Sequence, residues 1–307
     1  MFYYLCQALL NFLFPLKIKA AKGTISGCNL LKLRYKFRGG GLIQVSKGNQ
    51  LRFEDELIQG PVTKSKVKIL IGGENNTLTI SLQTKQLHPC IEMGGMNNKI
   101  AIGKNFKPFS SGMCWYWFGN GNVLTIGDNV TVPNNPRIPA HFNRISMGGE
   151  NCSITISDNC FLGLNIISGI HNACKDWHFE CGEGTALGGL LITPVSPCKI
   201  SIGKKVLLSW NVYIGCGSHA LIDENGNCRN VCQGVTIGDN CWIGANVVIP
   251  GTTLIPNGCI VGSNAVVTKS FEEERCVLGG VPAKIIKHDV KWIWESPIMV
   301  LRGMMYP

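Results

Sequence analysis

Charged residues are scarce in this 307-residue chain, at 16% of the total, and acidic residues are the scarcer kind. The low charged fraction disfavours a highly charged helical bundle, and the 37 glycines favour a β protein with many turns. Lys and Arg outnumber Asp and Glu by 29 to 19, and the net charge of +10 favours anionic partners. No base-stacking module or zinc-finger spacing accompanies this charge, so we expect no nucleic-acid partner. The alternative is that the lysines serve only solubility.

The apolar run at residues 1–16 lacks the features of a secretory leader, because no basic residue precedes it and no small-residue cleavage site follows it. It is also shorter than the about 20 residues of a membrane span. Three lysines follow at once, so residues 1–22 are a candidate for peripheral contact with the inner face of a membrane. The alternative is a helix packed on the end of the fold or on a neighbouring subunit. We expect a cytoplasmic protein, since an odd number of cysteines, 15, also favours a reducing compartment.

The periods of an α-helix and of an ordinary strand are both missing between residues 237 and 267. An aliphatic residue instead returns at every sixth position: Ile237, Ile243, Ile249, Ile255, Val261 and Val267. A smaller residue follows four positions after each of the first five: Cys241, Val247, Thr253, Cys259 and Ala265. A six-residue period is typical of a parallel β-solenoid, whose stacked coils bury a continuous core. The pattern therefore predicts an all-β fold, with the left-handed parallel β-helix as the natural candidate.

Short β phrases of one kind recur upstream of this stretch. They are Ile100–Gly103, Leu124–Gly127, Ile154–Ser157, Ile200–Gly203 and Val235–Gly238. Their spacing of 24 to 46 residues exceeds one simple three-sided coil, so we expect loops inserted in each coil. We predict three segments: an apolar and basic N-terminal segment with capping coils at 1–64, the β-helix at 65–270, and a closing loop and helix at 271–307. Short terminal helices complete the expected fold.

One interruption of the six-residue register carries a candidate catalytic group. The aliphatic positions run in phase at Ile202, Leu208 and Ile214, and the chain then leaves the register after His219 and returns at Val231. The eleven residues between them form a polar loop with a histidine at its root. Loops on a rigid scaffold are frequent sites of function, and histidine is well suited to take a proton near neutral pH. The alternative is a surface histidine at a turn.

The segment from Ser201 to Lys287 resembles the hexapeptide-repeat acyltransferases, most closely the branch that O-acetylates sugars and polysaccharides. The resemblance rests on five motifs: Leu208–Val212, Ser218–Gly226, Val235–Gly244, Val261–Lys269 and Gly280–Lys287. It implies direct transfer of acetyl from acetyl-CoA to a hydroxyl of a polysaccharide, lipooligosaccharide or sugar precursor, with no metal. It also implies a homotrimer in which the site lies between subunits.

The resemblance assigns roles to individual residues. His219 matches the catalytic base that deprotonates the acceptor hydroxyl. Positions beside the thioester and along the pantetheine arm are matched by Trp242, Ala245, Ser263, Thr268 and Lys269. Positions near the nucleotide phosphates are matched by Lys284 and Lys287. Gly217 departs from the acidic residue that the polysaccharide branch often has, and Asp223 is a candidate to orient the imidazole, or else it stabilises its turn.

Three other groups of residues leave alternatives open. His171, Cys174, His178 and Cys181 have the spacing of metal ligands, and one of the histidines could instead line the acceptor cleft. Cys216 and Cys232 flank the loop and raise an acyl-cysteine mechanism, although small coil positions would explain them. The aromatic run 115–118, in an expected inserted loop, suits sugar stacking, an oligomer contact or a core plug. For the whole chain the rivals are an antibiotic or amine acyltransferase, a zinc enzyme of the carbonic anhydrase type and a non-catalytic scaffold.

Overall fold

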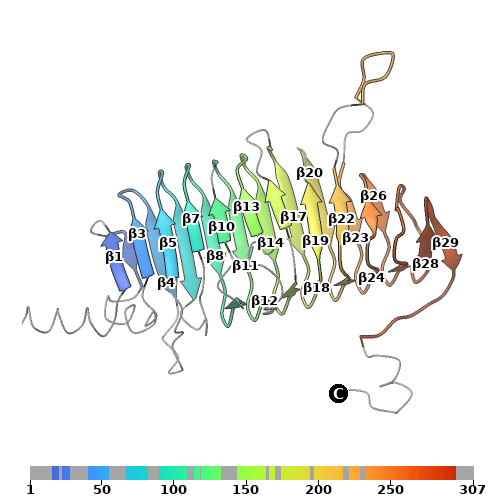
Figure 1. Cartoon of the computed structure of the whole chain (residues 1–307), viewed down its shortest axis with the longest axis horizontal. Coiled ribbons are helices and arrows are strands. Elements are labelled where there is room, and N and C mark those ends of the chain that lie inside the picture. Colours follow the sequence, from blue (N-terminus) through green and yellow to red (C-terminus); the bar gives the residue numbers. More distant parts are fainter. Residues whose placement is uncertain are drawn as a thin grey trace, which may run out of the picture.

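The chain folds into an elongated parallel β-solenoid whose coils stack along one axis (Figure 1). The computed structural model describes residues 16–20, 23–27, 41–54, 67–81, 90–108, 114–117, 119–132, 144–163, 166–169, 174–193, 197–216, 221–228 and 233–294. Strands that are adjacent in a sheet come from consecutive coils, which confirms the solenoid predicted from the six-residue period. Among the described residues, no helix has the length and apolar character that a membrane crossing requires.

Three sheets form the sides of the solenoid. Sheet 1 contains β1 (Leu16–Ala20), β3 (Gly41–Val45), β5 (Val67–Ile71), β7 (Cys90–Met93), β10 (Cys114–Trp117), β13 (Arg144–Met147), β16 (Ile166–Gly169), β19 (Leu190–Thr193), β22 (Val212–Gly215) and β25 (Val248–Ile249). Sheet 2 contains β2 (Ile25–Ser26), β4 (Gln50–Glu54), β6 (Thr77–Ser81), β8 (Lys99–Ile102), β11 (Val123–Ile126), β14 (Ser153–Ile156), β17 (Trp177–Cys181), β20 (Cys198–Ile202), β23 (Val235–Ile237) and β26 (Thr253–Ile255). Sheet 3 contains β9 (Lys107–Pro108), β12 (Thr131–Val132), β15 (Phe161–Leu162), β18 (Ala186–Leu187), β21 (Leu207–Leu208), β24 (Trp242–Ile243), β27 (Ile260–Val261), β28 (Val277–Gly280) and β29 (Ala283–Lys287).

The corners between the sheets form three edges that run along the solenoid. The first edge joins sheet 1 to sheet 2, as at residues 250–252. The second edge joins sheet 2 to sheet 3, as at residues 256–259, and the third edge joins sheet 3 to sheet 1, as at residues 244–247. Because coils stack in register, residues at matching positions of successive coils form columns along each edge.

The six-residue period arises because the periodic residues form the core. All six aliphatic positions from Ile237 to Val267 have at most 1% of their surface exposed, and the five intervening small residues at most 3%. One pair of inward residues thus serves each side, and three sides complete a coil. Val235 of β23 accordingly pairs with Thr253 of β26 in the next coil. Burying an aliphatic side chain contributes about 1.5–3 kcal/mol, so this repeated pair dominates the stability of each coil.

One coil contains none of the short β phrases found in the sequence. Ile154 pairs with Phe179 of β17, and Phe179 pairs with Ile200, so the longest interval between phrases contains a whole coil rather than only inserted loops. Phe179 and Cys181 fill the inward positions that aliphatic residues hold elsewhere, and both are buried. An aromatic ring and a thiol replace two aliphatic residues in this coil. An aliphatic repeat in the sequence therefore does not reveal it.

The predicted C-terminal helix is wrong where the structure describes it, because residues 283–287 form strand β29. This strand turns back antiparallel on β28 through a turn that pairs Gly280 with Ala283 and contains the cis Val281–Pro282 bond. β28 would otherwise expose its backbone N–H and C=O groups at the open end of sheet 3, and the hairpin pairs them. Ala283 is buried and its N–H donates to Val266 O at 2.8 Å, so the hairpin closes the last coil.

The N-terminal coils belong to the same sheets as the rest. β3 pairs with β5 along five residues, so sheet 1 continues across the boundary predicted at residue 64. The aromatic run was expected in an inserted loop, and this is wrong for residues 115–117, which lie in β10 between β7 and β13. Phe118 and the apolar run at 1–15 lie outside the described residues.

Buried asparagines connect the N-terminal coils. Asn49, Asn76, Asn98 and Asn122 are at most 1% exposed, and each Oδ1 accepts the backbone N–H of the residue at the same position in the next coil at 2.8–2.9 Å. Asn98 also donates from Nδ2 to two carbonyls, Gly94 O at 2.8 Å and Gly119 O at 2.7 Å. These asparagines therefore form a hydrogen-bonded ladder along the N-terminal coils.

We predict that Asn98→Ala lowers the free energy of unfolding by about 2 kcal/mol or more, because buried polar groups lose their partners at a cost of about 1–3 kcal/mol each. Urea denaturation followed by circular dichroism measures the change. Thr125→Ala, on the outer surface of β11, is the control and should cost less than about 1 kcal/mol. Equal losses for the two variants would show that the ladder contributes nothing special.

Candidate functional site

The interruption of the six-residue register lies at the first edge of the solenoid. The chain leaves after β22 in sheet 1 and re-enters at β23 in sheet 2, and residues 221–228 project from the body of the solenoid (Figure 1). His219, the predicted base, lies outside the described residues. In the described part of the loop, Ile222 and Cys228 form an antiparallel bridge. Leu221 and Ile222 are 64% and 55% exposed, so this loop presents apolar side chains to its surroundings.

Asp223 organises the turn at the tip of this loop. Its Oδ1 accepts the backbone N–H groups of Asn225 at 2.9 Å and of Asn227 at 2.8 Å. The carboxylate therefore stabilises the turn, which was one of the two roles expected from the sequence. Its other expected role, orienting His219, stays a prediction.

Thr268 and Lys269 lie on the same edge as the loop. Val267 N–H donates to Val248 O and Phe271 N–H donates to Leu254 O, which stacks the intervening residues on the turn at 250–252. Both side chains are exposed, and Lys269 Nζ lies 5.5 Å from the centroid of the buried Phe271 ring. The structure thus places two of the predicted cofactor contacts in the column that begins where the loop leaves the solenoid.

Ala245 and Ser263 lie on the third edge, in consecutive coils. Asn264 N–H donates to Ala245 O at 2.9 Å, which fixes their stacking. The surface is closely packed here, because a Cβ on Gly244 would lie 2.6 Å from Ser263 N and 2.9 Å from Ser263 Oγ. Small side chains on this edge leave a narrow surface along which an extended arm could lie.

Trp242 and Lys287 share one row across sheet 3. Trp242 pairs with Ile260, Ile260 with Val277, and Val277 with Lys287. Trp242 is 40% exposed, and its Nε1–H donates to Ser209 Oγ at 3.3 Å. Lys284 and Lys287 are both exposed on β29, at the end of this sheet. An aromatic ring and two cations therefore lie along sheet 3, next to the small residues of the third edge.

Trp210 belongs to this surface although the sequence assigned it no role. Its carbonyl accepts Asn246 N–H at 2.9 Å, which places Trp210 in the column of Ala245 and Ser263, one coil earlier. Its side chain is 55% exposed. The sequence could have indicated this role, because Trp210 lies in the motif Leu208–Val212, one coil before Ala245.

The predicted site residues thus fall into two sets that one chain does not bring together. The loop root with Thr268 and Lys269 lies on the first edge, whereas Ala245, Ser263 and sheet 3 lie on the other side of sheet 1. The triangular cross-section separates the edges, so a ligand spanning both sets on one chain would have to cross sheet 1.

Cys228 of the projecting loop is exposed, whereas Cys216 and Cys241 are core residues. Cys216 is 2% exposed, and burial raises the pKa of the Cys241 thiol to about 12 and that of Cys152 to about 11. Thiols in such surroundings are poor nucleophiles at neutral pH. The small-position interpretation is therefore confirmed for Cys216, while Cys232 lies outside the described residues.

The residues with metal-ligand spacing do not converge where they are described. Cys174 and Cys181 are buried in the core, and His178 points outward and is hydrogen-bonded through Nδ1 to Ser153 Oγ at 2.8 Å. His171 lies outside the described residues. Within the described part of the chain, no three His, Cys, Asp or Glu side chains group as metal ligands.

Comparison with known proteins decides the family. Residues 234–269 match the family described as bacterial transferase hexapeptide (six repeats). Polysialic acid O-acetyltransferase of Neisseria meningitidis is 33% identical over 176 residues, which are 57% of this chain and 76% of that protein. The chain belongs to the hexapeptide-repeat transferases.

Other O-acetyltransferases match shorter or longer parts of the chain. Galactoside O-acetyltransferase of Escherichia coli (strain K12) is 35% identical over 98 residues, and the match spans 31% of this chain. The chain spans only 47% of that enzyme and 56% of another relative from the same organism. In the crystal structure of the polysialic acid O-acetyltransferase OatWY, the fold matches with a TM-score of 0.50 at 31% identity, over 74% of this chain and 90% of that one.

Proposed function

We propose that this protein transfers acetyl from acetyl-CoA to a hydroxyl of a carbohydrate, most directly an acidic polysaccharide. The alignment with the polysialic acid O-acetyltransferase carries this proposal, because it extends over more than half of the chain. The net charge of +10 suits an anionic acceptor as well as the phosphates of CoA. We infer a cytoplasmic location, with residues 1–22 as the candidate for membrane contact.

In the proposed reaction His219 acts as the general base. Its imidazole takes the proton of the acceptor hydroxyl as that oxygen attacks the thioester carbonyl. The new C–O bond forms, the C–S bond breaks, and the CoA sulfur leaves with the proton returned by the imidazolium. No acyl-enzyme is needed, and the buried Cys216 is unsuited to form one.

The described residues suit the shape and charge of acetyl-CoA. Ala245, Ser263 and the close packing at Gly244 leave room for an extended pantetheine arm along the third edge. Trp242 provides an apolar surface beside this arm, and Lys284 and Lys287 offer cations for phosphates. Ligand grooves commonly combine an apolar lining with a few such polar groups.

We infer that the active enzyme is a homotrimer in which each site lies between two subunits. The separation of the two sets on different edges supports this, because a neighbouring chain could bring its first edge to the third edge of this one. The exposed Leu221 and Ile222 on the projecting loop would contact the neighbour. Cyclic oligomers of this kind place two different surfaces of one chain against each other.

We predict that His219→Ala lowers the rate of acetyl transfer to polysialic acid by about 10²- to 10⁴-fold, because the acceptor oxygen loses its base. The release of free CoA, followed with a thiol reagent, measures this rate. His288→Gln is the matched control, because His288 lies on the second edge, where it contacts Glu273, and its rate should stay near that of the native protein. An unchanged rate in His219→Ala would remove the proposed base.

A site shared between subunits also predicts complementation. Ser263→Trp should block the groove and His219→Ala the chemistry, so each variant alone is inactive. Trimers reassembled from an equal mixture should regain roughly a quarter of the native activity, since each site needs a native histidine from one chain and a native groove from its neighbour. Full inactivity of the mixed trimers would place both sets in one chain.

A further inference from the structure

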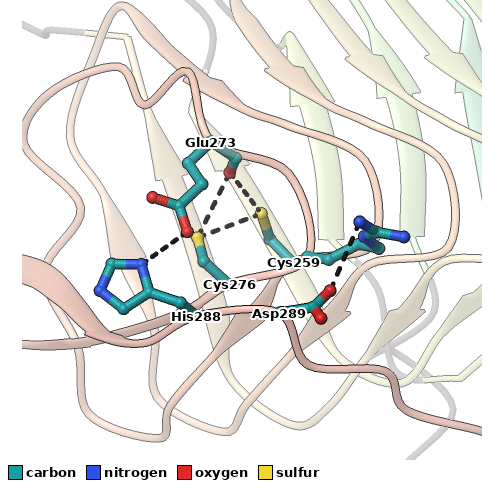
Figure 2. A network of polar contacts seen from close by, with 6 residues as sticks. Cys259, Glu273, Cys276, His288 and Asp289 are labelled. Carbon is teal, nitrogen blue, oxygen red and sulfur yellow. Dashed lines mark hydrogen bonds and ion pairs between the residues drawn. The ribbon is translucent and has the colours of Figure 1, made fainter.

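A C-terminal strap, residues 288–294, runs back from β29 along the second edge of the solenoid. Val290 N–H donates to Arg275 O at 2.7 Å, and the Trp292 indole N–H donates to Asn240 O, two coils away. Figure 2 shows the root of the strap, where His288 Nδ1 lies 2.7 Å from Glu273 Oε1 and Asp289 lies 3.4 Å from Arg275. The strap is therefore fixed to the edge at both ends.

The strap covers a gap in a column of the second edge. Backbone hydrogen bonds between coils align Asn105, Asn129, Asn159, Gly184, Lys205, Asn240, Gly258 and Arg275, all with left-handed or glycine backbone conformations at this corner. Where asparagines follow one another, Nδ2 of each donates to Oδ1 of the next, as from Asn105 to Asn129 at 3.1 Å. Gly258 has no side chain to fill its place between Asn240 and Arg275.

A cavity of about 430 Å³ lies in this gap, between the strap and the turns of three coils. The turns contribute the amide side chains of Asn240 and Asn257, and the strap contributes Lys291 and the partly exposed ring of Trp292. None of the eight lining residues is one of the predicted catalytic or cofactor residues. The cavity adjoins the surface proposed for the pantetheine arm, because the rings of Trp292 and Trp242 are 6.2 Å apart, centroid to centroid.

The charges of the lining favour a ligand with a single negative charge. Arg275 is already paired with Asp289, whereas Lys291 forms no ion pair among the residues that the structure describes. Glu274 also lines the cavity, and its Oε1 accepts Asn257 Nδ2 at 2.9 Å. A phosphate, with up to two charges, would be repelled by this carboxylate more strongly than a sugar carboxylate would.

The remaining lining matches a sugar ring. The indole of Trp292 is held by its bond to Asn240 and by tilted contacts with the rings of Trp242 and Trp294, at centroid distances of 6.2 and 5.3 Å. The part of the ring that faces the cavity offers an apolar surface on which the C–H face of a pyranose can pack. Asn240, Asn257 and Glu274 together offer donors and acceptors for hydroxyl groups. The volume falls in the range of small-molecule sites, about 300–1,000 Å³.

We propose that the cavity beneath the C-terminal strap binds one residue of a carboxylated sugar, with its carboxylate at Lys291 and its ring on Trp292. The proposal rests on the proposed function in taking a carbohydrate as the ligand. It gives the enzyme a second contact with an acidic polysaccharide, on the second edge and away from the first edge, where the loop after β22 leaves the solenoid.

Filling the gap tests the proposal. Asn tolerates the φ of +69° found at Gly258, and a Cβ there would lie 3.0 Å from Arg275 Cγ, in a flexible side chain that can move. Gly258→Asn should therefore fold and occupy the cavity. Gly184→Asn is the matched control, with the same φ of +69° in the same column and 3.6 Å to Lys205 Cγ, but with no strap above it.

Saturation-transfer NMR without acetyl-CoA would use glucuronate, N-acetylneuraminate and, as the neutral comparison, glucose. We expect the native chain and Gly184→Asn to transfer signal to at least one acidic sugar but not to glucose, and Gly258→Asn to lose most of it. If Gly258→Asn does not fold, Lys291→Gln is tested in its place. Its control is Lys204→Gln, which removes the same charge elsewhere on the same edge.

Three results would overturn the proposal: equal signals from glucose and both acidic sugars, unchanged signal in Gly258→Asn or in Lys291→Gln, or displacement of the sugar by CoA. The last would assign the cavity to the cofactor. Because binding is measured without acetyl transfer, a protein that binds acidic sugar but fails to acetylate it would contradict only the proposed function. An active enzyme with no binding here would contradict only this inference.

Discussion

The structure depends on parallel coils that stack in register, so that every residue lies over its counterpart in the next coil. Inside, this places Ile237, Ile255 and their equivalents in continuous buried columns. Along the N-terminal coils the same register aligns Asn76, Asn98 and Asn122 in a hydrogen-bonded ladder. The backbone N–H and C=O groups of each coil form hydrogen bonds with those of the next coil. At the end of the solenoid, β29 pairs with the backbone groups of β28.

On this scaffold the proposed functional sites lie where the type of residue in a column changes or where a loop is inserted. On the first edge the chain inserts the loop after β22 that carries His219 at its root. On the third edge small residues, Ala245 and Ser263, replace the larger Trp210 of the preceding coil, and this supports a groove for a long arm. On the second edge Gly258 opens the cavity that the strap covers. The regular coils thus fix where each irregular residue must lie.

Residues of the core could be predicted from the sequence, because each six-residue side of a coil buries the same pair of positions. The coil at β17 was missed because Phe179 and Cys181 break the aliphatic pattern while still filling the core. Within the segment 271–307, where a closing loop and helix were expected, residues 283–287 form a strand, since pairing with β28 outweighs the local preference. The distribution of the site residues over two edges and the path of the strap depend on coil register and on contacts between distant residues, which no local pattern records.

We propose that the regular coils hold acetyl-CoA while the interrupted coil acetylates an acidic sugar chain. The most direct measurement is the release of free CoA from acetyl-CoA by the native protein with a panel of acidic glycans, neutral glycans and amines. We predict that acidic glycans stimulate the release above all others and that the product carries an ester that mild alkali removes. Stimulation by amines alone, with an alkali-stable amide as product, would contradict the account.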